Sequence, residues 1–190
     1  VVTAFTSTGF TLGADSSGFG NENTHTYASW NWKAGGSGVS NTDGSITSTV
    51  SANADTGFSI VSYTGTGSDG STVGHGLSSA PELAIIKGRD AGYPWMVMGY
   101  PTNTSFPNDG SFLTLSTTDA MGNGTGSEIS LGSSTMTFVD AGGNICESSR
   151  DYIAYCFHSV DGYSKFGTYT GNDNADGPFV YTGFRPAFVM

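Results

Sequence analysis

The side chains that could carry catalysis are few and scattered along this chain. His25, His75 and His158 stand alone, without the H-x-x-x-H or C-x-x-C spacing of zinc ligands. No G-x-S-x-G elbow selects a serine as a nucleophile. Glycoside hydrolysis needs two carboxyl groups at a set separation, and the sequence indicates no such pair. The isolated glutamates are Glu22, Glu82, Glu128 and Glu147. We therefore expect that the protein is not an enzyme.

Aromatic side chains in or beside predicted loops are candidates for ligand binding. Tyr93, Trp95, Tyr100 and Phe106 could stack on a sugar ring, because an aromatic face is apolar and has polar groups nearby. The run from Trp95 to Met98 equally fits a buried strand, so core packing is the favoured interpretation, with ligand binding as the alternative. Trp30 and Trp32, two residues apart, are expected in core or intersubunit packing.

Short acidic loops offer oxygen atoms of the kind that calcium prefers. The best candidate is the loop from Asn172 to Gly177, with Asp173 and Asp176, and the loops Ser68–Gly70 and Gly13–Asp15 are weaker. None has the spacing of an EF-hand. Asx turns explain the same residues without a metal, so we expect no cofactor and keep calcium as the alternative.

Composition favours strands and turns and disfavours several partners. The 190 residues include 29 Gly, 13% are aromatic, and only 12% are charged, so good helix formers are scarce. The net charge of −10 would repel a nucleic-acid backbone. No apolar run is long enough for a membrane span, and no signal peptide is visible. The sequence thus predicts an all-β protein that binds neither nucleic acid nor membranes.

The two cysteines, Cys146 and Cys156, are too few for a disulfide framework. Their separation also has no metal-ligand spacing. We expect buried free thiols, with a single hairpin disulfide as the alternative.

An internal repeat gives the strongest architectural signal. Gly57–Lys87 and Gly162–Met190 share G-[FY]-S, then S/T-Y-T-G, D-G, V-x-x-G-[LF] and P, in the same order. Tyr63 thus corresponds to Tyr169. The other matched positions are Gly65, Gly70, Gly76 and Pro81 with Gly171, Gly177, Gly183 and Pro186.

A second matched pair lies upstream of these segments. Thr26–Lys33 matches Asp151–His158, and alternation predicts that both are strands. Each follows another short predicted strand, Gly9–Leu12 in the first copy and Thr135–Phe138 in the second. The chain therefore carries the later half of one unit before the complete unit.

This order predicts four parts. Residues 1–35 are the later half of a preceding unit, and residues 36–57 are a Gly/Ser/Asn-rich connection with a possible strand at Ile46–Val50. Residues 58–158 form a complete unit, and residues 159–190 begin a following unit. A half unit cannot bury its apolar face alone, so we expect its strands to be shared with other units or other chains.

Three stretches carry a likeness to a known group: SYTGTGSDGSTVGHGLSSAPELAIIK, TYTGNDNADGPFVYTGFRPAFVM and YASWNWKAGG. They resemble tandem repeats of uncharacterised domains in marine bacteriophage virion proteins of the tail-fibre-like kind. The resemblance implies an antiparallel β-sandwich, concanavalin-like or jelly-roll, in a virion appendage. It assigns no catalytic residue.

We therefore expect a structural virion component, such as a tail fibre or capsid decoration protein, found in the virion or extracellularly. Its expected partners are copies of itself, as a homo-oligomer, and other virion proteins. The alternative is a carbohydrate-binding module for host-surface glycans, and glycan hydrolysis is a distant third hypothesis.

Overall fold

The computed structural model describes residues 2–15, 17–18, 20–99, 111–115, 117–119, 122–123 and 128–189. Its strands pair antiparallel, and one short 3-10 helix, η1 (Ala54–Thr56), occurs in this part of the chain. The chain forms two compact units, Val1–Trp32 and Lys33–Met190. Within the described ranges, no helix has the length and apolar character required to cross a bilayer. The predicted all-β class is confirmed.

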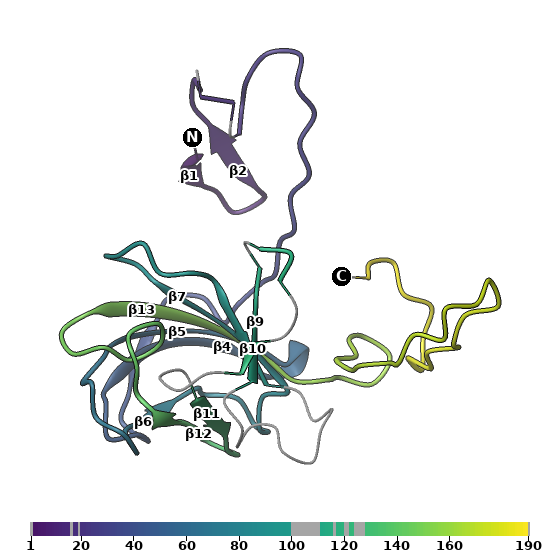
Figure 1. Cartoon of the computed structure of the whole chain (residues 1–190). Helices are drawn as coiled ribbons and strands as arrows, with labels where there is room; N and C mark the ends of the chain where they lie inside the picture. Colours follow the sequence, from purple (N-terminus) through teal and green to yellow (C-terminus); the bar gives the residue numbers. More distant parts are fainter. Residues whose placement is uncertain are drawn as a thin grey trace. The chain divides into compact units, whose positions relative to one another are not determined.

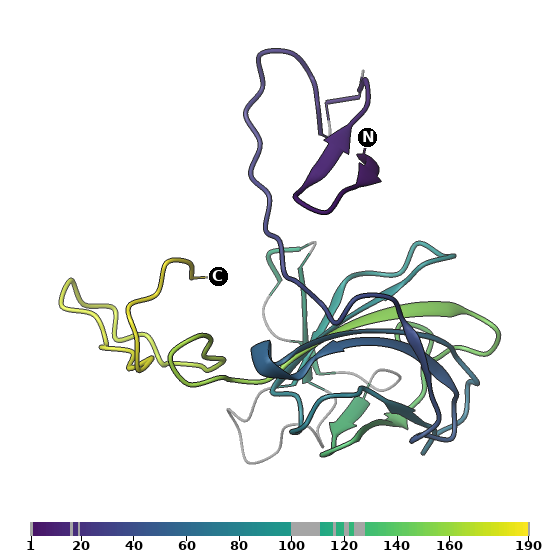
Figure 2. The ribbon, with the colours of Figure 1, turned by 180° about the vertical axis from the view of Figure 1, so that it is seen from behind.

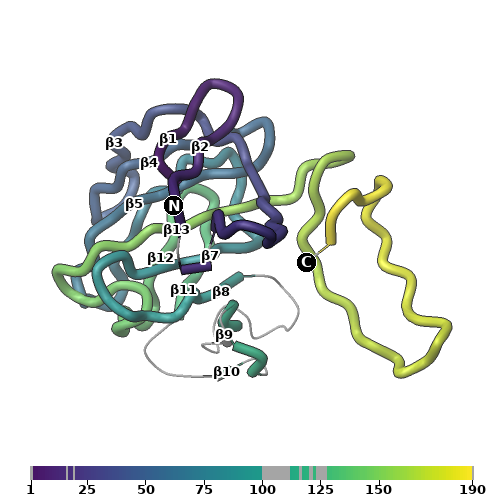
Figure 3. Tube along the Cα trace, turned by 90° about the horizontal axis from the view of Figure 1, so that it is seen from above, coloured from purple at the N-terminus to yellow at the C-terminus, as the bar shows by residue number. Residues whose placement is uncertain are grey.

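The second unit is built on a large antiparallel sheet. Among the described residues its order is β10-β9-β8-β7-β13-β5-β4-β3; most of these strands are labelled in Figure 1, and all of them in Figure 3, which is seen from above. β13 lies in the middle and pairs along its length with both β5 and β7. The strands are β3 (Val39–Asn41), β4 (Ser48–Asn53), β5 (Phe58–Thr64), β7 (Leu83–Gly88), β8 (Met96–Met98), β9 (Ser111–Thr114), β10 (Gly122–Asn123) and β13 (Asp151–Phe157).

A smaller sheet covers one face of the large one (Figures 1 and 2). Its order is β11-β12-β6, again antiparallel. The strands are β6 (Thr72–Gly74), β11 (Glu128–Leu131) and β12 (Thr135–Asp140). The two sheets make the antiparallel β-sandwich that the sequence predicts.

Alternation along the strands builds the core between the sheets. In β13, Tyr152, Ala154 and Cys156 are fully buried, while Ile153 and Tyr155 point to the opposite face. The strand predicted at Asp151–His158 is confirmed. Fully buried side chains from the small sheet complete the core, namely Val73, Ile129, Met136 and Phe138.

Two polar side chains of the core, Tyr63 and His75, have hydrogen-bond partners. The Tyr63 hydroxyl donates a 2.6 Å hydrogen bond to the carbonyl of Ile145. The Leu77 N–H donates to Nδ1 of His75, so the ring proton is on Nε2, which donates to the Gly132 carbonyl at 3.1 Å. Burial lowers the pKa of His75 from its ordinary value of 6.5. The neutral imidazole is therefore the form that fits the fold.

Both cysteines are buried free thiols, as predicted. The Sγ atom of Cys156 lies 3.6 Å from Sδ of Met136 in the core. Burial raises the pKa of the Cys156 thiol to about 12, so the thiol stays protonated. These residues therefore act as small core side chains.

The Gly/Ser-rich stretch 36–57 is part of the sandwich. It contributes β3 and β4 at one edge of the large sheet, where Val50 pairs with Val39 on one side and Val61 on the other. The possible strand predicted near Ile46–Val50 begins at Ser48, and Ile46 forms an isolated bridge. The division of the chain into repeat units stays a prediction.

The first unit contains a two-stranded hairpin, β1 (Val2–Phe5) with β2 (Phe10–Leu12). The strand predicted at Gly9–Leu12 is confirmed, but the one predicted at Thr26–Lys33 is wrong for this chain, because that segment has no regular structure. Strands require neighbouring strands for their backbone hydrogen bonds. The matching segment β13 is a strand because β5 and β7 flank it.

The segment that begins at Gly162, which matches Gly57–Lys87, also has almost no regular structure. An isolated bridge joins Val160 to Ser164, and residues 165–189 contain no strand. Figure 1 draws this yellow segment without arrows. The matching segment Gly57–Lys87 forms β5, β6 and the start of β7. Two segments that share one sequence pattern therefore have different structures in one chain.

Candidate interaction surfaces

The structure separates the two predicted sugar-stacking residues that it describes. The ring of Tyr93 lies parallel to Tyr152, with centroids 6.3 Å apart, and its hydroxyl donates to the Glu147 carboxylate. The indole of Trp95 stacks on Tyr155, also at 6.3 Å. Because Tyr152 and Tyr155 are three apart in one strand, their side chains point to opposite faces. Tyr93 and Trp95 therefore do not share one platform.

Tyr100 and Phe106, the other two predicted contacts, lie outside the described residues. Asp173 and Asp176 lie in an exposed turn. There the Asn172 side chain accepts a hydrogen bond from the Asn174 N–H, and the Asn174 side chain accepts one from the Asp176 N–H. These Asx bonds account for the turn. No group of three possible metal ligands occurs in the described part of the chain, and calcium binding stays an untested alternative.

An apolar row crosses the outer face of the large sheet, opposite the core. Successive strand registers place five side chains next to one another, one from each of five adjacent strands. We call this set the outer row: Ile60, Tyr155, Ile85, Val97 and Leu113. The outer row was not predicted from the sequence, although the continuous apolar run Leu83–Ile86 indicates a strand with two apolar faces.

Trp95 completes this surface because its ring, 38% exposed, lies against Tyr155. Beside the row, Lys87 directs its Nζ to the carbonyls of Gly88 and Ala91. An apolar strip with one exposed indole can hold the face of a sugar or an apolar side chain.

A charged cluster joins two loops at one end of the large sheet. Arg150 lies 3.7 Å from the Glu147 carboxylate and 3.9 Å from the Asp90 carboxylate. All three side chains are about 40% exposed, so each ion pair contributes at most about 1 kcal/mol. The arginine bridges the two carboxylates, and Asp90 also accepts a hydrogen bond from the Asp151 N–H. We interpret the cluster as a structural contact that holds these two loops together.

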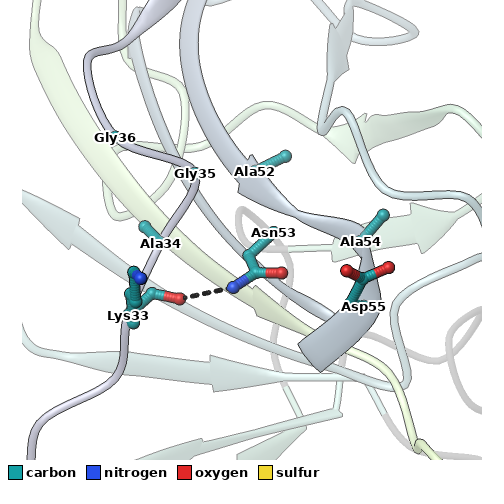
Figure 4. A pocket seen from close by; sticks show the side chains of 8 residues that line it. All are labelled: Lys33, Ala34, Gly35, Gly36, Ala52, Asn53, Ala54 and Asp55. Carbon is teal, nitrogen blue, oxygen red and sulfur yellow. Dashed lines mark hydrogen bonds between the residues drawn. The ribbon is translucent and has the colours of Figure 1, made fainter.

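A shallow hollow of about 580 Å³ marks the point where the chain enters the second unit (Figure 4). It is lined by Lys33–Gly36 and Ala52–Asp55. The Asn53 side chain donates to the Lys33 carbonyl at 3.1 Å. A Cβ atom at Gly35 would lie 2.0 Å from the carbonyl oxygen of Ala52, so only glycine fits there. The hollow reflects close backbone packing of the incoming chain.

The largest exposed apolar side chains are concentrated in the two segments that match the repeat. Residues 163–189 expose 69% of Tyr169 and 89% of Phe179, and the first unit exposes 86% of Phe5. Other exposed members are Tyr27, Trp30, Trp32, Tyr163, Val180, Tyr181, Phe188 and Val189. Apolar exposure on this scale is typical of surfaces that bind a partner.

The first unit also reproduces local structures of the second. The Tyr27 hydroxyl donates to the Gly18 carbonyl nine residues earlier and accepts from the Glu22 N–H five residues earlier. The same two bonds, at the same spacings, are made by Tyr152 with Gly143 and Glu147. Three residues before each tyrosine, a non-glycine residue has positive φ, at Thr24 and Ser149. The likeness therefore extends to hydrogen-bond geometry.

No curated protein and no solved structure matches the chain. One family does match, along residues 1–190. The chain belongs to the DUF7483 family, a domain of unknown function.

Proposed function

We propose that this protein is a structural component of a virion appendage, either a fibre or a decoration protein. It works without catalysis, by assembling with further copies of itself and with other virion proteins in the virion or outside the cell. The observation that carries the proposal is the exposure of the repeat-matched segments. Residues 163–189 are exposed, whereas their counterparts in β5 and β6 are strands of the sandwich.

Energetics support assembly. Tyr63 is 3% exposed and its counterpart Tyr169 is 69% exposed. Covering a large side chain is worth about 1.5 to 3 kcal/mol, so covering several such side chains favours association. Residues 165–189 contain no strand, and a segment of this kind can add to a sheet edge.

The test is the mass of the intact chain in solution, measured by light scattering over a range of concentrations. We expect species larger than one chain, increasing with concentration. The variant Phe179→Ser should weaken association, whereas Val39→Ser, at an exposed position of edge strand β3, is the matched control. A single species with the mass of one chain at every concentration would overturn the proposal.

The outer row supports a second candidate, a carbohydrate-binding module for host-surface glycans. Trp95 over Tyr155 offers an apolar ring face beside an apolar strip. A glycan array should then show binding that Trp95→Ala abolishes and Tyr27→Ala, in the other unit, leaves unchanged. An array without hits would exclude this candidate.

A further inference from the structure

We propose that residues 159–166 form a strap that opens and closes as one body on the folded sandwich, and that the Glu82 carboxylate holds it closed. The strap follows β13 directly, and its last residue, Phe166, lies against the ring of Phe157. Opening uncovers this ring and lengthens the apolar surface of the outer face. The inference concerns the second unit alone and does not depend on the proposed assembly.

The contact that holds the strap is a carboxylate in a fixed position. Glu82 precedes β7, and its backbone N–H donates a 2.7 Å hydrogen bond to the Phe157 carbonyl at the end of β13. Its carboxylate accepts two hydrogen bonds from Ser159, one from the backbone N–H at 2.7 Å and one from the hydroxyl. Hydrogen bonds to an ionised group are about twice as strong as neutral ones. Glu82 therefore ties the start of the strap to the large sheet.

The rest of the strap is folded around this contact. The Ser159 hydroxyl also accepts a 3.1 Å hydrogen bond from the Phe166 N–H, which joins the two ends of the strap. Between them, Val160 and Ser164 exchange two backbone hydrogen bonds of 3.0 Å, and Gly162 has the positive φ that a tight turn requires. Loss of the contact with Glu82 loosens both ends, so the segment moves as one body.

The apolar contact under the strap is aromatic. Alternation places Phe58 and Phe157 on the outer face, next to Ile60 and Tyr155 of the outer row. The two phenylalanine rings stack at 4.8 Å, and the Phe166 ring lies 5.4 Å from that of Phe157. Phe157 is only 7% exposed. Phe166 therefore helps to bury one end of an apolar surface that continues as the outer row.

Two buried polar atoms make the closed strap less stable. The hydroxyl oxygen of Ser164 and Nε2 of His158 have no hydrogen-bond partner among the described residues. Nδ1 of His158 donates to the Ser159 carbonyl at 2.8 Å, so in the neutral ring Nε2 carries an unpaired acceptor. A buried polar group without a partner is unfavourable, and contact with water on opening removes that cost. The strap is thus an element of low local stability on a well-packed sandwich.

The experiment is hydrogen exchange of the full chain, followed by mass spectrometry at urea concentrations below the unfolding transition. The amides that donate hydrogen bonds within the strap report its opening: Ser159, Val160, Tyr163, Ser164 and Phe166. We expect them to exchange faster than the amides of β5 and β13 and with little dependence on urea, because a local opening exposes little surface. Exchange at the rate of those two strands, with the urea dependence of global unfolding, would overturn the inference.

The variant Glu82→Gln tests the contact that holds the strap. An amide can still accept a hydrogen bond from Ser159 but lacks the charge, so exchange in the strap should become about tenfold faster while β5 and β13 are unchanged. Glu128→Gln, at the start of β11, removes the same charge and is the matched control. Equal rates in the strap for the two variants would contradict the role of Glu82.

A second pair of variants tests the aromatic contact. Phe166→Ala should speed exchange in the strap by a similar factor, because the ring against Phe157 is lost. Tyr163→Ala, at a position of the same strap that is 55% exposed, is its control and should have little effect. Equal effects of these two variants would contradict the proposed closed state. If Glu82→Gln does not fold, the urea dependence in the unchanged chain still decides whether the strap opens locally.

Discussion

A single hydroxyl group provides the sharpest test of the sandwich core. In Tyr63→Phe, the ring keeps its stacking on Tyr152 at 5.4 Å and its contact with Phe138 at 5.3 Å. What is lost is the 2.6 Å hydrogen bond to the carbonyl of Ile145, a completely buried residue. Leaving a buried acceptor unpaired costs about 1 to 3 kcal/mol. We therefore expect the free energy of unfolding to fall by about 2 kcal/mol.

The measurement is urea unfolding, monitored by tryptophan fluorescence and circular dichroism at a concentration where the chain is monomeric. With a denaturant slope of about 2 kcal/mol per molar urea, the midpoint should fall by about 1 M. Tyr169→Phe is the matched control, because Tyr169 occupies the same repeat position and is 69% exposed. Its effect should stay within about 0.5 kcal/mol.

Equal shifts in the two variants, or no shift in Tyr63→Phe, would refute the reasoning. Either result would mean that the buried hydroxyl of Tyr63 contributes no more to stability than the exposed hydroxyl of Tyr169.

Three further predictions concern other residues of the second unit. Because burial lowers the pKa of His75 below 6.5, the unfolded chain binds a proton before the folded one. Stability should be complete above pH 6.5 and decline below it by up to about 1.4 kcal/mol per pH unit, and the slope should be smaller in His75→Gln. Gly35→Ala should lower the melting temperature, because its Cβ would lie 2.0 Å from a β4 carbonyl, whereas Gly92→Ala, with open space around it, should not. Cys146 and Cys156 should resist thiol reagents in native buffer and react in urea, as a thiol titration would show.

Sequence periodicity predicted correctly those strands that pair with neighbouring strands in this chain. The alternation of Asp151–His158 and the Thr135–Phe138 pattern both give strands. Thr26–Lys33 has the same alternation and forms no strand. Periodicity describes which side chains can share a face, but hydrogen-bond partners come from elsewhere in the fold. A single-sequence pattern therefore cannot tell a strand from a segment with the same alternation and no regular structure.

The candidate site was less predictable for a local reason. Tyr93 and Trp95, two residues apart, would share a face in a regular strand. β8 begins only at Met96, so the backbone before it is irregular and the two rings separate. A closer comparison of Gly18 to Tyr27 with Gly143 to Tyr152 could have revealed the shared tyrosine loop, since the spacings are equal.

The positions of the two chain connections have a mechanical consequence. Lys33 is held by Asn53, His158 by the Gly57 carbonyl, and Asn53, Phe58 and Phe157 form one rung of the large sheet. The incoming and outgoing chain thus meet the sandwich at the same end of its strands. Tension along the chain would therefore break the residue pairs between adjacent strands one after another, instead of shearing all of them at once.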